Sequence, residues 1–232
     1  MIAIPEHLNS AKAQGAFLNQ PIGQFELGEH QNFIYLVMDW KSKQVLWVDP
    51  QLNLTEPLDF LKRNQFMTKG ILLTHTHFDH IAGVPTLLSL FHDSQLYVHR
   101  NDLYRLHESI RSHNNLRFIE ESDQINLGET SIKVMHTPGH SAGCCCYHVQ
   151  ADRSYLLTGD TLFIEDCGRT DLPSGDDQQM FESLQKIKEL PKNTIILPGH
   201  HYRRPCASTL ATELIHNPAL QCKNVQELKE LN

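Results

Sequence analysis

A cluster of metal-ligand side chains constrains this chain more than any other feature of its sequence. The segment His75-Thr76-His77-Phe78-Asp79-His80 carries three imidazoles and one carboxylate within six residues. Zinc and similar cations are bound by neutral imidazole and by carboxylate, and a catalytic site keeps one position open for water. In an extended stretch His75 and His77 point to the same side and can share one cation, whereas Asp79 and His80 lie beyond a bend and can reach a second. Neither pair completes a coordination sphere, so the fold must bring further ligands to this loop.

Three more candidate ligands lie far along the chain, in places that resemble the position of His75. His75 follows the apolar run Gly70–Thr74, and His140, Asp160 and His200 each come just after a similar run, near Gly or Pro. The ends of strands are where a rigid sheet presents functional groups on loops. A carboxylate such as Asp160 can bridge two cations because it has two oxygens. The predicted ligands are His75, His77, Asp79, His80, His140, Asp160 and His200.

A closed structural metal site and a set of unrelated histidines are the simpler alternatives. For any single histidine, a solvated loop or a hydrogen-bonded core is the better explanation, but neither explains the whole set. Seven ligands are too many for one tetrahedral ion, and cysteine is absent from the cluster. We therefore expect a catalytic metal centre.

The 232 residues alternate between strand-like and helix-like segments, which favours sheets covered by helices. We expect one domain over residues 1–232, with an N-terminal extension of about 20 residues and a short helical C-terminal extension over about 203–232. A first helix is expected to begin near Thr55, with that residue as its N-cap. Further helices are expected over Val84–Phe91, Asn101–Arg111 and Asp177–Leu190. The expected strands are Asn32–Met38, Gln44–Val48, Gly70–Thr74, Gln95–Val98, Ser131–Met135, Cys144–Val149, Tyr155–Thr158 and Thr194–Leu197.

Charge and composition exclude several classes of function. The formal net charge of −7 provides no basic field for nucleic acid. No stretch reads as a signal peptide or approaches a membrane span, so we expect a cytoplasmic protein without a membrane partner. The run Cys144-Cys145-Cys146 is a poor disulfide framework, since alternate side chains of a strand point to opposite faces. Reduced, buried thiols fit it better.

The motifs together resemble the metallo-β-lactamase superfamily. They are Thr74–His80, Thr137-Pro138-Gly139-His140, Thr158-Gly159-Asp160 and Pro198-Gly199-His200, in the order of that family. The resemblance implies an α/β fold of the αββα type, two mixed β-sheets flanked by helices, with the site at one edge of the sheets. It further implies that His75, His77 and His140 bind a first metal and that Asp79, His80 and His200 bind a second, with Asp160 bridging.

The sequence after Asp160 indicates which group of that superfamily the chain resembles. Thr161–Ile164, Cys167–Asp171 and Pro198–Tyr202 look like glyoxalase II (hydroxyacylglutathione hydrolase) and its relatives, the persulfide dioxygenases. In that group, residues at the positions of Arg169 and Tyr202 lie near the thiol-bearing part of the substrate. A surface salt bridge for Arg169 and a packed loop anchor for Tyr202 are the plain alternatives.

The resemblance implies hydrolysis of a thioester by metal-bound hydroxide, with two Zn²⁺ ions, or Fe or Mn in their place. Since a thiolate leaves readily, Asp79 is the only candidate acid in the cluster. The basic helix with which glyoxalase II grips glutathione is not recognisable after His200, so acyl-coenzyme A and acyl-carrier-protein thioesters stand beside acyl-glutathione. We expect a small-molecule, thiol-linked substrate or an acyl carrier protein as partner, and a monomer or homodimer.

Two other functions remain open at this point. A persulfide dioxygenase would hold one Fe²⁺ with His75, His140 and Asp160, a two-His-one-carboxylate triad. The second alternative is a module that binds a metal or an acyl carrier without catalysis. A purely structural fold, however, would not need an open, carboxylate-bridged site.

Overall fold

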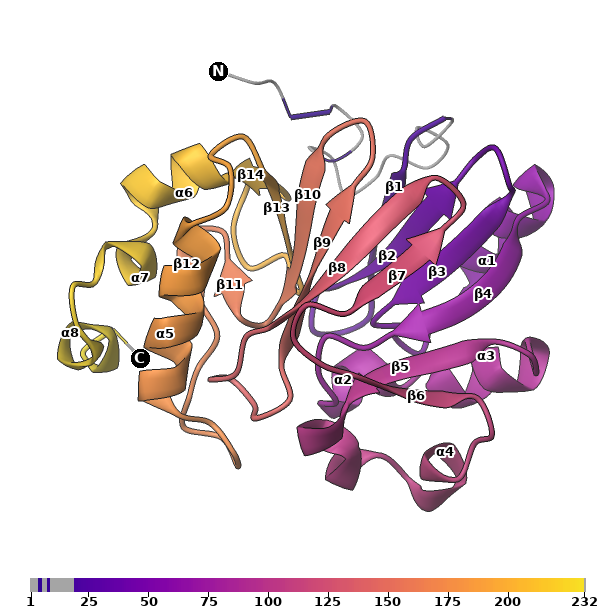
Figure 1. Cartoon of the computed structure of the whole chain (residues 1–232), viewed down its shortest axis with the longest axis horizontal. Helices are drawn as coiled ribbons and strands as arrows, with labels where there is room; N and C mark the ends of the chain where they lie inside the picture. Colours follow the sequence, from indigo (N-terminus) through magenta and orange to yellow (C-terminus); the bar gives the residue numbers. More distant parts are fainter. Residues whose placement is uncertain (1–3, 6–7, 9–18, 232) are drawn as a thin grey trace.

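Two six-stranded β-sheets face each other in the computed structural model, and helices cover their outer faces (Figure 1). The structure describes residues 4–5, 8 and 19–231. The first sheet has the order β1-β2-β3-β4-β5-β6 and the second the order β14-β13-β10-β9-β8-β7. Both sheets are mixed, because β3 to β6 pair in parallel beside the antiparallel β1 and β2, and only β10 and β13 are parallel in the second sheet.

The strands are short and connect through loops that gather at the two ends of the sandwich. In the first sheet they are β1 (Ile22–Leu27), β2 (Asn32–Asp39), β3 (Gln44–Val48), β4 (Met67–Leu72), β5 (Gln95–His99) and β6 (Leu116–Ile119). In the second they are β7 (Gln124–Leu127), β8 (Thr130–His136), β9 (Cys145–Gln150), β10 (Ser154–Gly159), β13 (Ile195–Pro198) and β14 (Ser208–Thr209). A separate hairpin joins β11 (Leu162–Phe163) to β12 (Asp166–Cys167).

Helices form the two outer layers, one on each sheet (Figure 1). The first sheet is covered by α1 (Thr55–Asn64), α2 (Phe78–Ile81), α3 (Val84–Leu90), a 3₁₀-helix (Arg100–Arg105) and α4 (Glu108–Arg111). The second sheet is covered by α5 (Asp177–Lys188), α6 (Leu210–His216), α7 (Pro218–Gln221) and α8 (Val225–Lys229).

The side chains of β2 show why the sheets stack. All eight residues of β2 are buried, so the strand reads as a continuous apolar run rather than an alternating one. Tyr35 and Val37 join the cluster between the two sheets, whereas Leu36 and Met38 point outward into the cluster with Phe60 of α1. Both faces of the strand are therefore needed for packing.

The second sheet has the same two-sided pattern. Leu157 of β10 faces the other sheet, and Leu156 packs outward against Met180, Leu184 and Ile187, which share one face of α5. The side chain of Asp176 caps α5 by accepting a hydrogen bond from the backbone N–H of Gln179. The result is a four-layer αββα sandwich, the fold class that the sequence predicts.

The eight expected strands are present, most of them with ends displaced by one or two residues. The expected helix Asn101–Arg111 is wrong as a single element. The structure instead has the 3₁₀-helix Arg100–Arg105 and α4, separated by extended backbone at Leu106 and His107. The N-cap of α1 is Leu54 rather than Thr55. Several short strands, β1, β6 and β7 among them, carry no strong sequence signal.

The expected N-terminal extension falls largely outside the described residues. The expected C-terminal extension contains α6, α7 and α8, whose Leu210, Leu220 and Leu228 pack in the same cluster as α5. Among the residues that the structure describes, no helix is long and apolar enough to span a bilayer. The division into one domain with two extensions stays a prediction.

Candidate metal centre

The seven predicted ligands come together at one edge of the sandwich, where β4, β10 and β13 run into loops. His75 follows β4, Asp160 follows β10, and His200 follows β13. His140 lies on the loop between β8 and β9, and α2 carries Asp79 and His80. Close approach of these segments requires glycine, since a Cβ on Gly199 would lie 2.3 Å from Asp160 Oδ1.

His75, His77 and His140 form the first ligand set, with one ligand atom of each lying within 4.8 Å of the other two. Nε2 of His140 lies 2.8 Å from Nδ1 of His77. The other nitrogen of His140 donates its N–H to the backbone carbonyl of Arg169, at 2.8 Å. That hydrogen bond leaves Nε2 of His140 with its lone pair pointing into the set, as a metal-bound histidine requires.

Asp79, His80 and His200 form the second ligand set. Nε2 of His80 lies 3.0 Å from Nε2 of His200, and Asp79 Oδ2 lies 3.4 Å from the latter. Nδ1–H of His200 donates to the carbonyl of His30, which again leaves Nε2 free. Asn32 Nδ2 donates to Asp79 Oδ2 at 2.9 Å and fixes that carboxylate.

Asp160 lies between the two sets. Its Oδ2 is 3.5 Å from His140 Nε2 and 3.3 Å from His200 Nε2, and its Oδ1 is 3.4 Å from His80 Nε2. One carboxylate therefore faces an imidazole of the first set and two of the second. A carboxylate in this place has one oxygen available for a cation at each set, as the predicted bridging role of Asp160 requires.

Asp49 was not predicted from the sequence, although its carboxylate contacts one of the ligands and the residue before another. Asp49 Oδ2 accepts the Nδ1–H of His80 at 3.0 Å and the hydroxyl of Thr74 at 2.5 Å, and its Oδ1 accepts the backbone N–H of Thr74. The Thr74 hydroxyl lies 3.1 Å from Nδ1 of His75. A signal was present, since Asp49 directly follows the run Gln44–Val48 just as His75 directly follows its own run.

Burial keeps two histidines of the first ligand set, His75 and His77, uncharged. It lowers the pKa of His75 well below the usual value, and burial together with His140 lowers the pKa of His77 to about 4. Burial alone would raise the pKa of Asp160, but the imidazoles of His80 and His200 hold it well below its usual range. Neutral imidazole and ionised carboxylate are the forms that bind a cation.

The pKa of His80 is shifted in the opposite direction, and the cause of this shift supports a cation site. Burial would lower its pKa, but Asp160 and Asp49 raise it well above the usual value. A proton on His80 thus balances the carboxylates that face it. A bound cation would supply the same charge and release that proton.

Two buried polar atoms give further evidence that these residues fit a divalent metal. His75 Nε2 is buried with no hydrogen-bond partner among the described residues, and Asp160 Oδ1, also buried without a hydrogen bond there, has the ion-pair contact with His80 Nε2 at 3.4 Å. Buried polar atoms are rarely left without a partner, and such a group calls for an ion or an equivalent. Both atoms face the ligand sets, so a cation there would satisfy them.

The two predicted substrate contacts lie near this centre, on exposed loops. The Arg169 guanidinium forms a two-pronged salt bridge with Asp171, at 2.5 and 2.6 Å, and its side chain is exposed. The Tyr202 ring stacks on His200, with ring centroids 4.6 Å apart. Burial, with Asp160 and Asp79, raises the pKa of Tyr202 to about 12. These contacts match the plain alternatives for both residues, and substrate binding by them stays a prediction.

The three consecutive cysteines are buried and unbonded to one another, as expected. Burial raises the pKa of Cys146 to about 11, so this thiol is a poor nucleophile at neutral pH.

An αββα sandwich with a two-set histidine and carboxylate centre at its sheet edge defines a metal-dependent class of enzymes. The family model described as Metallo-beta-lactamase superfamily matches residues 27–200, and the chain belongs to that superfamily. Within it, the chain fits the glyoxalase II and ETHE1-like group.

Relatives and solved structures support this placement. A hydroxyacylglutathione hydrolase of Enterobacter is 32% identical over 203 residues, covering 87% of this chain and 75% of that enzyme. A probable polyketide biosynthesis zinc-dependent hydrolase of Bacillus subtilis is 29% identical and covers 80% of each chain. The crystal structure of ETHE1 from Myxococcus xanthus superposes with a TM-score of 0.78 at 26% identity, covering 89% of this chain and 87% of that one.

The contacts of Asp49 lead to a first prediction. Asp49→Asn should lower metal affinity about 10- to 100-fold, because supporting partners of ligating histidines have effects of that size. The asparagine amide cannot accept from His80, the Thr74 hydroxyl and the Thr74 backbone N–H together, because an NH₂ donor takes the place of one carboxylate oxygen. Chelator competition measures the affinity. An Asp49→Asn protein with unchanged affinity would show that His80 is held in place without Asp49.

Proposed function

We propose that this protein is a two-metal hydrolase that cleaves thioesters of acyl-glutathione, acyl-coenzyme A or acyl-carrier-protein type. One observation carries the proposal: Asp160 faces both ligand sets, at 3.5 Å from His140 and at 3.3 Å from His200. A one-ion site would use only one of the sets. The hydroxyacylglutathione hydrolase relative supports the thioester bond as the target.

Divalent cations bound by the two sets would supply an activated water, with a pKa of about 7, and polarise the substrate carbonyl. The chain's own residues hold the rest of the reaction in place. Asp160 keeps the two sets at a fixed separation, and Asp79 stands at the second set with a carboxylate able to take up a proton. The pKa of Asp79 lies below its usual range because His80 and Asn32 outweigh its burial. It is therefore ionised at neutral pH, which is the form in which a carboxylate binds a cation.

The leaving group needs little help, since a thiolate is a weak base. The carbon-sulfur bond breaks as the carbonyl carbon gains its new oxygen, and the products are a carboxylic acid and a free thiol. Tyr202, protonated at neutral pH, and Arg169 are the residues that we propose to contact the carrier part of the substrate.

The metal content gives a second prediction. We expect close to two zinc-like ions per chain, at a separation of about 3.5–4 Å as in other two-metal sites. Elemental analysis of protein purified without added metal measures both the number and the identity. One tightly held iron, with His77, Asp79, His80 and His200 left unoccupied, would count against the hydrolase and favour the dioxygenase.

A substrate panel gives a third prediction and tests the proposal directly. The wild-type protein should release free thiol from simple acyl thioesters with kcat/KM of about 10⁴ M⁻¹s⁻¹ or more. The panel contains S-lactoylglutathione, acetyl-coenzyme A and an acyl-pantetheine as a carrier mimic, with chelator-treated protein as control. Arg169→Ala and Tyr202→Phe should raise KM more than they lower kcat if these residues bind the non-reacting part of the substrate.

A second candidate, a persulfide dioxygenase, is favoured by the likeness to ETHE1. In that reaction His75, His140 and Asp160 would hold one iron and the second set would be unused. Oxygen consumption with glutathione persulfide, followed in parallel with the panel, separates the two. Oxygen uptake without thioester cleavage would refute the hydrolase.

A further inference from the structure

Asp102, on the 3₁₀-helix Arg100–Arg105, joins the two loops that carry the first ligand set. Its side chain is completely buried. It belongs to none of the candidate metal-binding groups found among the described residues. Its contacts nevertheless run to Thr76, between His75 and His77, and to Ser141 and Gly143, just after His140.

Both carboxylate oxygens of Asp102 are used twice. Oδ2 accepts the backbone N–H of Thr76 at 3.1 Å and the hydroxyl of Ser141 at 2.8 Å. Oδ1 accepts the backbone N–H of Gly143 at 2.8 Å and a guanidinium N–H of Arg105 at 3.2 Å. The backbone carbonyl of Asp102 also accepts the hydroxyl of Thr76, at 2.9 Å. Four donors thus converge on one carboxylate, which only an acceptor-only group can satisfy.

Asp102 is tightly packed against the loop that follows His140. A Cβ on Gly143 would lie 2.7 Å from Cβ, Cγ and N of Asp102, so the loop after His140 approaches as closely as glycine allows. Arg105 extends the connection, because its other nitrogen donates to the carbonyl of Pro173 at 2.5 Å and to Ser174 Oγ at 3.2 Å. Ser174 Oγ in turn accepts the N–H of Ala142. The loop that follows Arg169 is therefore held by the same residues.

We propose that Asp102 is a positioning residue that sets the metal affinity of the first ligand set by holding His75, His77 and His140 in register. It acts through Thr76, Ser141 and Gly143 and touches no cation. The inference rests on the proposed function only in requiring that the first set binds a metal.

Asp102→Asn tests it, because asparagine has nearly the same shape but one oxygen becomes an NH₂ group. That group would face two donors, so two of the four hydrogen bonds are lost and the two ligand loops separate. The variant is made in a His200→Ala background, which removes a ligand of the second set and leaves the first set intact. We expect its affinity for Zn²⁺, measured by competition with a chromophoric chelator, to fall about 10- to 100-fold.

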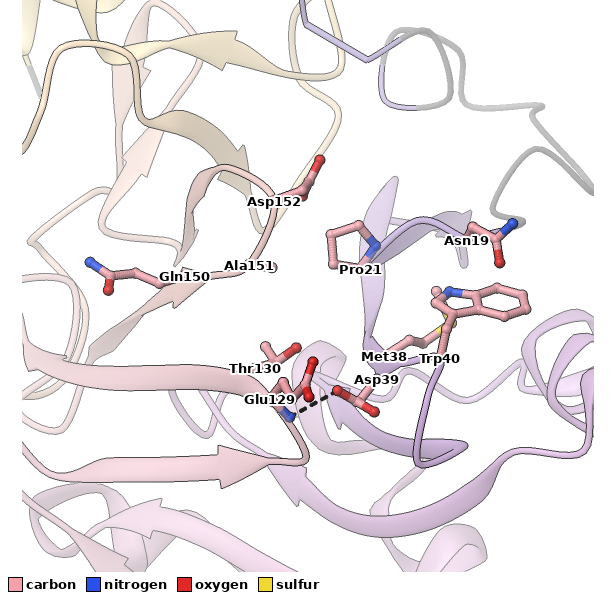
Figure 2. Close-up of a pocket in the computed structure, with 10 residues that line it drawn as sticks. All are labelled: Asn19, Pro21, Met38, Asp39, Trp40, Glu129, Thr130, Gln150, Ala151 and Asp152. Carbon is pink, nitrogen blue, oxygen red and sulfur yellow. Dashed lines mark hydrogen bonds between the residues drawn. The ribbon is translucent and has the colours of Figure 1, made fainter.

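Asp39→Asn is the matched control. Asp39 is also a buried carboxylate with converging donors, the N–H and hydroxyl of Ser42 at 2.7 Å each and the N–H of Glu129 at 3.0 Å. It lies beside the surface cleft of Figure 2, where the dashed line marks its bond to Glu129. This cleft is at the end of β2 opposite to Asn32, away from the ligands. Asp39→Asn should lower thermal stability and leave Zn²⁺ affinity unchanged.

The readouts separate positioning from general damage. The melting temperature of the metal-free variants reports stability, and chelator competition reports affinity. Ser141→Ala, which removes one donor without leaving a wrong one, should weaken Zn²⁺ binding several-fold and provides the test if Asp102→Asn does not fold. Zn²⁺ affinity equal to that of the parent in Asp102→Asn or Ser141→Ala, or an equal loss in Asp39→Asn, would overturn the proposal. No thioester enters these measurements, so a wild-type protein inactive on the panel would refute the proposed function and leave this inference standing.

Discussion

Replacing His75, His140 or Asp160 by alanine is expected to abolish activity. These three residues serve the centre under both enzymatic candidates, since the hydrolase and the dioxygenase would both use His75, His140 and Asp160. A metal ion contributes several kcal/mol to transition-state stabilisation, and about 1.4 kcal/mol corresponds to a factor of ten. We therefore expect kcat/KM to fall roughly 10³-fold or more. Thiol release across the panel measures the fall, and elemental analysis measures the accompanying loss of metal.

His148→Ala is the matched control for the histidine variants. His148 is also largely buried, on β9, but its Nε2 contacts the hydroxyl of Ser154 and not the centre. Its loss should reduce stability with little effect on kcat/KM. Full activity of His75→Ala or Asp160→Ala would show that the reaction takes place elsewhere on the molecule.

His200→Ala is expected to separate the two enzymatic candidates. Nε2 of His200 lies 3.0 Å from His80 and 3.3 Å from Asp160, so its removal opens the second set and leaves the first intact. For a two-metal hydrolase we expect the metal content to drop from about two ions to about one and kcat/KM to fall roughly 10³-fold. For a one-iron dioxygenase the change should be mild.

His201→Gln is the comparison for this variant. His201 neighbours His200 in sequence, but its Nδ1 pairs with Glu26 and its Nε2 contacts Cys206. It should keep both ions. If His200→Ala also kept both ions and full hydrolysis, the assignment of the second set would be wrong.

Much of the fold and the centre could be predicted because the local signals are strong. Strands buried on both faces, such as Asn32–Asp39, appear in the sequence as long apolar runs with β-branched and aromatic residues. The prediction of a single helix over Asn101–Arg111 was wrong for a physical reason. It has helical composition, but Asp102 directs its carboxylate and its carbonyl to other loops, and the backbone is extended at Leu106 and His107.

The chemistry of the candidate ligands was determined by the sequence alone. Residue type decides which atoms can bind a cation, and the spacing of His75, His77, Asp79 and His80 decides which of them can act together. Only the tertiary structure decided which distant groups support them. The carbonyls of Arg169 and His30 orient His140 and His200, and no sequence pattern marks a carbonyl. Asp49 and Asp102 are ordinary acidic residues until packing excludes water and directs several donors to them. These roles depend on contacts between residues far apart in the chain, which local spacing does not encode.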